Sequence, residues 1–359
     1  MMLYPPVRQH GFNLIEMMIG VTVGLLGLVA AATIYVNFNK HRTVETSLME
    51  AQSNGSMALF LLERDLDRAG YGFMAMQGCS CNYDPGSGAT TQLRSFCEKF
   101  PSSPVQAHPV DPIQITDGGA SGSDELHVRY GTPLGGLTVT SVLAKQVDPD
   151  AIPQDPAKDF LYKFKLKSTA GIVNGEILVL DRGGKCAAYQ ATAVSESDKT
   201  VSHDHSASNI NPDPAPLGYE ASLPNDVIYN LGHYVDKKFR VDSSSAQLLE
   251  STFPTYTNDT PVVDNIVYMK VDIGLDTGTD KLVDSWVKIV PTDYSKVLAL
   301  RVGIVARTQI KDNDSPTPAT LVVLPAVAGG TEQTYTVPDQ KYRYKVYSTT
   351  IPLRNMLWN

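Results

Sequence analysis

The stretch that decides the fold covers residues 11–36, GFNLIEMMIGVTVGLLGLVAAATIYV. From Met17 to Val36 it contains no charged side chain. At about 1.5 Å per residue, a helix over this segment reaches about 30 Å, enough to cross the hydrocarbon core of a bilayer. The sequence therefore predicts a transmembrane helix at about 17–36, preceded by a short leader peptide, residues 1–11.

Glu16 is the unusual residue of this stretch, because a carboxylate one turn into an apolar helix is costly unless it meets water or a cation. No Lys or Arg occurs between Phe12 and Asn39, so the helix itself offers Glu16 no partner. Cleavage after Gly11 would give Phe12 a positively charged α-amino group. We therefore expect Glu16 of one subunit to pair with Phe12 of its neighbour in a bundle of such helices, where low dielectric strengthens the attraction.

Two other interpretations account for an apolar N-terminal segment. An ordinary signal peptide could use the three alanines at 30–32 as its cleavage site, and a plain uncleaved anchor is the second alternative. Neither explains why a glycine, a phenylalanine and a glutamate stand at this spacing before the apolar run.

Gly11-Phe12-x-x-x-Glu16, followed at once by an apolar helix, resembles the class III signal of type IV prepilins. The resemblance implies that prepilin peptidase, a membrane aspartyl protease, cuts between Gly11 and Phe12. It also implies that Phe12 is N-methylated and that Glu16 forms the assembly charge pair.

Gly20, Gly24 and Gly27 form a face of small residues on the apolar half of the helix. Such faces let helices pack closely in lipid, although a glycine that faces lipid without a partner is also common. Together with Glu16, these glycines favour a crowded bundle of helices.

The helix is expected to continue beyond the membrane segment. No proline occurs between Pro6 and Pro85, and the apolar residues after Asn37 recur every three or four positions. The pattern predicts one helix over 12–70, half transmembrane and half amphipathic, with Gly70 as its stop signal. The amphipathic half must bury its apolar face, and a C-terminal sheet is the natural candidate. That face comprises Val44, Leu48, Ala51, Gly55, Ala58, Leu62, Leu66 and Ala69.

Residues 48–73, LMEAQSNGSMALFLLERDLDRAGYGF, are similar to the block that follows the membrane helix in minor pilins of the PilW type. Residues 264–276, 297–308 and 344–355 are similar to the C-terminal core of the same group. The resemblance implies an α+β, type IV pilin-like fold. In such a fold the long N-terminal helix packs on a C-terminal antiparallel β-sheet domain, here enlarged and rich in loops, over 71–359.

Short alternating runs separated by Pro-, Gly-, Ser- and Asp-rich loops predict the strands of this domain. The domain exceeds what a minimal pilin head needs, and the resemblance does not reach its middle. We therefore expect an inserted subdomain at about 80–260. The predicted strands are Glu125–Tyr130, Phe160–Lys167, Glu176–Asp181, Val227–Val235, Val262–Ile273, Trp286–Val290, Val297–Thr308, Thr320–Leu324 and Arg343–Leu353.

The chain contains four cysteines, Cys79, Cys81, Cys97 and Cys186. All four would lie outside the inner membrane in an oxidising compartment, where an even count predicts two disulfides. Cys79 and Cys81 are too close for an easy mutual bridge, so each is expected to bond elsewhere, with Cys81 to Cys97 as one option. Four thiolates around zinc are the alternative, but C-x-C with single distant partners is poor zinc spacing.

No catalytic motif emerges from the sequence, and we predict no enzymatic activity, cofactor or metal. The chain has 30 Lys and Arg residues and 38 Asp and Glu residues. The resulting net charge of −8 argues against nucleic acid as a partner. His203-Asp204-His205 lies in a Ser-, Asn- and Pro-rich stretch and is interpreted as a solvated loop. Residues 182–185, RGGK, lack P-loop spacing and are interpreted as a turn.

Four aspartates, Asp272, Asp276, Asp280 and Asp284, surround a Thr-Gly-Thr turn. Spaced carboxylates around a glycine are typical of calcium loops, yet the D-x-[DN]-x-[DN]-G-x₅-E pattern is absent. A β-hairpin turn with acidic surface residues is the favoured interpretation, and a calcium site is left open.

The resemblance implies a minor pilin that works with other minor pilins and the major pilin, primes assembly of a type IV pilus and sits at the tip. Before assembly it would span the inner membrane once, with residues 71–359 in the periplasm. It would meet membrane lipid, prepilin peptidase and the inner-membrane assembly platform there. The alternatives are a type II secretion pseudopilin and an adhesin or other binding module displayed on the pilus.

Overall fold

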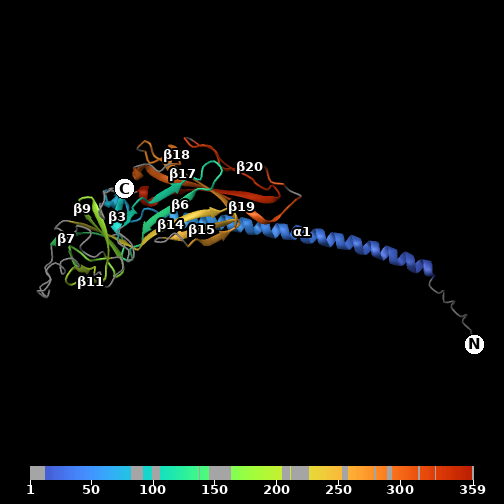
Figure 1. Ribbon diagram of the computed structural model, residues 1–359, viewed down its shortest axis with the longest axis horizontal. Coiled ribbons are helices and arrows are strands. Elements are labelled where there is room, and N and C mark those ends of the chain that lie inside the picture. The colour runs from blue at the N-terminus through green and yellow to red at the C-terminus, as the bar shows by residue number, and fades with distance from the viewer. Residues whose placement is uncertain are drawn as a thin grey trace, which may run out of the picture.

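The computed structural model describes residues 13–81, 92–98, 106–136, 138–144, 163–203, 211, 226–252, 258–278, 280–288, 293–313, 316–327 and 329–357. Figure 1 shows an elongated molecule in which one long helix, α1, runs along a β-rich head and then projects far beyond it. The fold class is α+β, as predicted.

Helix α1 covers Leu14–Leu66 without interruption. The chain leaves it through a turn that contains Gly70, whose φ of +78° lies in the left-handed region where glycine is favoured. The backbone N–H of Gly70 donates to the carbonyl oxygen of Arg129, at 2.9 Å, which fixes the end of the helix against the head. The predicted stop at Gly70 is therefore a turn that the sheet holds in place.

The part of the head that contacts α1 contains two antiparallel sheets, with strand orders β18-β17-β19-β22 and β16-β15-β14-β6-β5. Their core also takes in α1, since Leu62 and Leu66 cluster with Phe239, Met269 and Leu300. The strands are β5 (Ile113–Thr116), β6 (Glu125–Gly131), β14 (Tyr234–Asp242), β15 (Gln247–Thr252), β16 (Thr260–Asp264), β17 (Ile266–Leu275), β18 (Ser285–Val287), β19 (Val297–Lys311) and β22 (Tyr342–Pro352).

Smaller elements complete this part of the head. Strands β20 (Thr320–Leu324) and β21 (Gln333–Thr336) pair as a two-stranded sheet. A 3-10 turn, η4 (Tyr294–Lys296), precedes β19, and a short helix, α2 (Arg354–Leu357), follows β22.

A further sheet, with 11 strands, follows the order β11-β12-β8-β7-β13-β9-β10-β1-β2, with β3 also paired to β10 and β4 to β3. It is mixed, because β1 and β3 run parallel to β10. A 3-10 turn, η1 (Met74–Met76), leads into it. Its strands are β1 (Ser80–Cys81), β2 (Gln92–Leu93), β3 (Ser95–Glu98), β4 (Gln106–Pro109), β7 (Val139–Ala144), β8 (Lys163–Leu166), β9 (Ile177–Arg182), β10 (Lys185–Gln190), β11 (Ala193–Ser195), β12 (Thr200–Ser202) and β13 (Val227–Gly232).

This sheet has hydrophobic clusters of its own, around Phe164 and Leu178 on one side and around Phe96 and Val179 on the other. Figure 1 shows β7, β9 and β11 at the end of the molecule opposite the N-terminus. The span of about 80–260 expected as an insertion is thus shared between sheets, because β5, β6, β14 and β15 pack in the helix-bound core.

Two disulfides lie in and next to the 11-stranded sheet. Cys79 is bonded to Cys186 on β10, and Cys81 on β1 is bonded to Cys97 on β3, with Cα–Cα distances of 5.3 and 4.9 Å. The predicted pairing of Cys81 with Cys97 is confirmed. Because Cys79 and Cys186 are far apart in sequence, their bond ties the chain just after α1 to the middle of the 11-stranded sheet.

A buried ionic network lies beneath the sheet of β17 and β18. Asp124 has a fully buried side chain and accepts hydrogen bonds from Lys270 Nζ and Lys288 Nζ, both at 2.7 Å, and from the backbone N–H of Val271 at 2.9 Å. Lys270 is also buried, at 1% exposure, so its charge needs compensation, which comes from Asp124 at 2.7 Å and from the half-exposed Asp117 at 3.5 Å.

Candidate functional site

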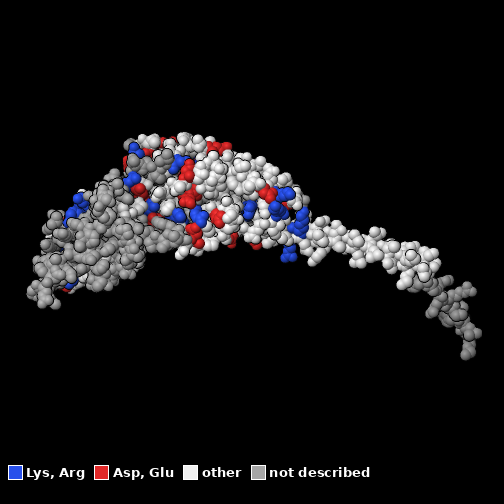
Figure 2. Space-filling model, viewed as in Figure 1, with Lys and Arg blue, Asp and Glu red and all other residues white. Residues whose placement is uncertain are grey.

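The projecting half of α1 is the most unusual surface of the molecule. Every residue from Asn13 to Phe38 is exposed, and an 18-residue window of the helix has a mean hydropathy of 2.2 with none of it buried. Figure 2 shows this half as a white rod, with charged side chains gathered where it joins the head. Its length and composition suffice to cross a bilayer.

Glu16 lies in the first turn of this rod and is exposed. Within the part of the chain that the structure describes, its carboxylate forms no ion pair, and its backbone N–H donates to the carbonyl oxygen of Asn13 at 3.0 Å. Gly11 and Phe12, the predicted cleavage and methylation positions, lie outside the described residues. Glu16 thus places a carboxylate with no ion-pair partner among the described residues on the apolar half of the helix.

The glycine face of the rod is equally open. A Cβ atom added at Gly20, Gly24 or Gly27 would meet nothing within 4 Å. No contact among the described residues therefore explains why these positions are glycines. Close packing against another helix would explain it.

The other half of α1 is docked on the head through one stripe of side chains. Gly55 lies under the ring of Tyr347 on β22, where a Cβ would stand 2.4 Å from a ring carbon. Ser47 Oγ accepts from the backbone N–H of Gln309 on β19, at 3.0 Å. The buried residues are Val44, Ser47, Ala51, Gly55, Ala58, Leu62, Asp65 and Leu66, which confirms the predicted apolar face except at Leu48, which is half-buried.

Asp65 is a docking residue that the sequence analysis missed. Its side chain is only 1% exposed and accepts from the hydroxyl of Tyr130, at 2.9 Å, and from Lys237 Nζ, at 3.1 Å. Burial, and then the charge of Asp65, raise the pKa of Tyr130 to about 12, so the phenol remains a hydrogen-bond donor. A signal was present, because Asp65 stands three residues after Leu62 and four before Ala69, on the apolar stripe itself.

A residue near the C-terminus of the chain, Asn355 on α2, contacts the C-terminal end of α1. Asn355 Nδ2 donates to the carbonyl oxygens of Asp67 and Ala69, at 3.1 and 3.2 Å. These carbonyls would otherwise lie unpaired at the end of α1. The docked half of α1 is therefore fixed to the head by packing, by the ion pair of Asp65 with Lys237 and by the hydrogen bonds of Asn355.

The described residues give little support to the other candidates from sequence. The interpretation of residues 203–205 as a solvated loop is wrong at His203, which is buried and stacks on Phe164 with ring centroids 4.1 Å apart. Asp204 and His205 lie outside the described residues. Residues 182–185 form the turn between β9 and β10, as predicted.

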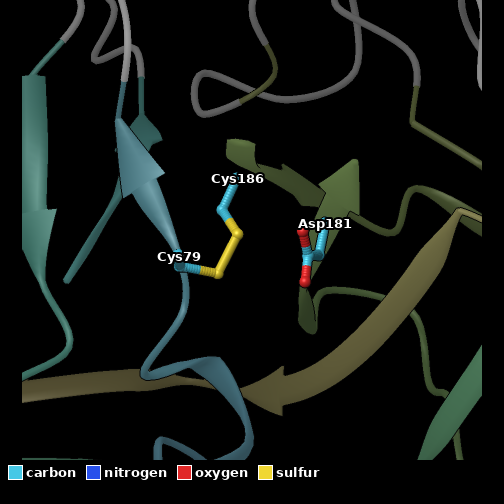
Figure 3. A group of neighbouring side chains, drawn as sticks. All are labelled: Cys79, Asp181 and Cys186. Carbon is cyan, nitrogen blue, oxygen red and sulfur yellow. A yellow bond between two sulfur atoms is a disulfide. The ribbon is translucent and has the colours of Figure 1, made fainter. Parts of the chain in front are cut away.

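The cysteines are not available as thiolates. Figure 3 shows Asp181 beside the Cys79–Cys186 disulfide, a group whose side-chain atoms lie within 4.8 Å of one another. No described cysteine is free, so the zinc alternative has no ligands. The carboxylate of Asp181 instead accepts from the backbone N–H of Gly184, at 2.7 Å, in the β9–β10 turn.

Comparison with known proteins gives a match in the C-terminal part of the chain. Residues 238–355 match the family model described as PilW, type IV pilus-assembly protein W. These residues form a PilW-family region. The resemblance to the PilW type inferred from the sequence is thereby confirmed.

A solved type IV-like pilin from Thermus thermophilus is similar with 12% identity, over 51% of this chain and 85% of that chain. Its TM-score of 0.25 is too low to carry an inference of its own. A search of curated proteins gives no match.

The PilW-family region supplies most of the surface on which α1 is docked. It contains β17, β19 and β22, together with Gln309, Tyr347 and Asn355, which contact the helix directly. The 11-stranded sheet lies outside the match. The matched region is therefore the part of the head on which α1 docks.

Proposed function

We propose that this protein is a minor pilin that prepilin peptidase cuts between Gly11 and Phe12 and that enters a type IV pilus through α1. One observation carries the proposal: a rigidly docked helix presents an exposed apolar half, with the unpaired carboxylate of Glu16 near its end, from a PilW-family head. Such a surface is stable in lipid, and in a bundle of similar helices once Glu16 meets a cation.

The proposed role is priming. With other minor pilins the protein would start a fibre that the major pilin then extends, and it would remain in the tip complex. The size of the head supports this role, because an 11-stranded sheet beside the helix-bound sheets is difficult to repeat in every layer of a tightly stacked fibre.

Before assembly, α1 would hold the protein in the inner membrane beside the assembly platform, with the head in the periplasm. The two disulfides are consistent with an oxidising compartment. After assembly the head would be extracellular.

Display of a binding surface is a second candidate for the same molecule. The 11-stranded sheet lies at the end opposite the N-terminus of α1, so in a fibre it would point away from the shaft (Figure 1). An adhesin function would place the ligand at this sheet, and it is compatible with priming.

Deletion of the gene in its native host tests the proposed function. We expect the deletion strain to bear few or no surface fibres, and the wild-type gene to restore them with the protein present in sheared fibres at far below the amount of major pilin. Normal fibres in the deletion strain, together with loss of secreted enzymes, would contradict the proposal and favour a type II secretion pseudopilin.

A further inference from the structure

The turn between β17 and β18 gathers three carboxylates that play no part in docking the helix. Asp276, Asp280 and Asp284 each place a carboxylate oxygen within 4.8 Å of the others. Asp276 is buried, whereas Asp280 and Asp284 are exposed. Asp272, also considered from sequence, is not part of this group, because it is paired with Arg301 NH2 at 2.6 Å.

One oxygen of this group is buried without a partner. Asp276 is 6% exposed, and its Oδ2 accepts from the backbone N–H of Lys281 at 3.1 Å, but its Oδ1 has no hydrogen bond. A Cβ added at Gly278 would lie 3.6 Å from both Asp276 Oδ1 and Asp284 Oδ2, so the two oxygens face a common space. A buried carboxylate oxygen without a donor is costly, and a bound cation would remove the cost.

The turn already holds the other two carboxylates in place. Asp284 Oδ2 accepts from the backbone N–H groups of Thr277 and Gly278, at 2.8 and 2.9 Å, and Asp280 Oδ1 accepts from that of Leu282, at 3.0 Å.

No cationic side chain compensates these charges. Among the residues that the structure describes, none of the three aspartates forms an ion pair, although Lys281 lies within the turn itself. Three carboxylates therefore converge with their charge uncompensated, unlike Asp124 and Asp272, whose charges are neutralised by lysine and arginine.

We propose that Asp276, Asp280 and Asp284 bind one calcium ion. The ligands are all carboxylate oxygens, which suits a hard cation, and the group contains no histidine or cysteine that would favour zinc. Calcium accepts irregular sets of six to eight oxygens, and the exposed side of the turn leaves room for water ligands. The ion would tie the end of β17 to the start of β18, at the edge of the helix-bound sheet.

Isothermal titration of the full-length protein in detergent, freed of metal with a chelator and then titrated with CaCl₂, tests this proposal. We expect one ion per chain, with a dissociation constant in the range of about 10⁻⁵–10⁻³ M. Asp280→Asn, at an exposed position where the amide oxygen can still accept from the backbone N–H of Leu282, should weaken binding by about tenfold or more. MgCl₂ should bind more weakly than CaCl₂.

Asp242→Asn is the matched control. Asp242 also stands in a hairpin turn, where its Oδ1 accepts from the backbone N–H two residues on, that of Ser244, at 2.9 Å. This variant should bind calcium as the wild type does. The proposal is overturned if the wild type shows no saturable binding up to about 10 mM, beyond the range of extracellular calcium modules. Equal affinities for the wild type and Asp280→Asn, or tighter binding of magnesium, would overturn it as well.

Discussion

Glu16→Ala is expected to keep the protein out of assembled fibres while leaving it in the membrane. Under the proposed function, Glu16 neutralises the α-amino group of Phe12 on a neighbouring subunit within a bundle of apolar helices. Removing one member of a buried charge pair costs about 3–5 kcal/mol. Since about 1.4 kcal/mol corresponds to a tenfold change, the amount of variant in sheared fibres should fall at least about tenfold.

Glu45→Ala provides the control for this experiment. Glu45 is an exposed acid on the same helix, beyond the apolar half. The control should enter fibres as the wild type does, and immunoblots of membrane and sheared-fibre fractions measure both variants. Equal incorporation of Glu16→Ala and the wild type would show that the charge pair does not govern entry of this subunit.

Asp124→Ala is expected to lower the free energy of unfolding by about 3–5 kcal/mol. The substitution leaves Lys270, which is 1% exposed, without its 2.7 Å partner, and it removes an acceptor from Lys288 and from the backbone N–H of Val271. Lys288 is 20% exposed and retains the buried Asp272 at 3.3 Å. Lys270 is 1% exposed and retains the half-exposed Asp117 at 3.5 Å, so most of the cost arises at Lys270. Chemical unfolding of the full-length protein in detergent, followed by circular dichroism, measures the loss.

A double-mutant cycle separates the ion pair from simple loss of volume. The pair Asp124→Ala and Lys270→Met removes both charges, so the double variant should be less destabilised than the sum of the two single variants. Asp264→Ala, which removes an exposed carboxylate hydrogen-bonded to Gln247 at 2.8 Å, should change stability by no more than about 0.5 kcal/mol. Additive effects of the two single substitutions would contradict the assigned role of the network.

The long helix and the strands of the helix-bound sheet could be predicted from sequence because their signals are local. From Met17 to Val36 α1 carries no charged side chain, and its docked half repeats every three or four residues, as the buried stripe confirms. The strands predicted at 297–308 and 343–353 correspond to β19 and β22, which pair along most of their length. The mostly apolar run at the start of β19 identifies a core strand without tertiary information.

Other boundaries depend on single residues with unusual backbone angles. The strand predicted over 262–273 is two strands, β16 and β17, because Asn265 has a φ of +67°. The strand predicted over 227–235 is likewise divided into β13 and β14 next to Gly232, whose φ is +68°. Asparagine and glycine are the residues that tolerate this conformation, so a weak signal existed at both positions.

The long-range features could not be predicted from spacing. Asp124 and Lys270 lie far apart in the chain, and only the pairing of the strands brings them together. The parallel pairing of β1 and β3 with β10 has the same origin. The role of Asp65 has the same origin, because its partners Tyr130 and Lys237 lie far away in the chain and reach it only through the tertiary fold.

The mature N-terminus is the measurement that tests the central claim most directly. Mass spectrometry of the protein purified from its native host should find a chain that begins at Phe12, with a methylated α-amino group and residues 1–11 absent. A chain that begins at Met1, or after the alanines at 30–32, would contradict the account, because Glu16 would then lose the cation on which its place in an apolar helix depends.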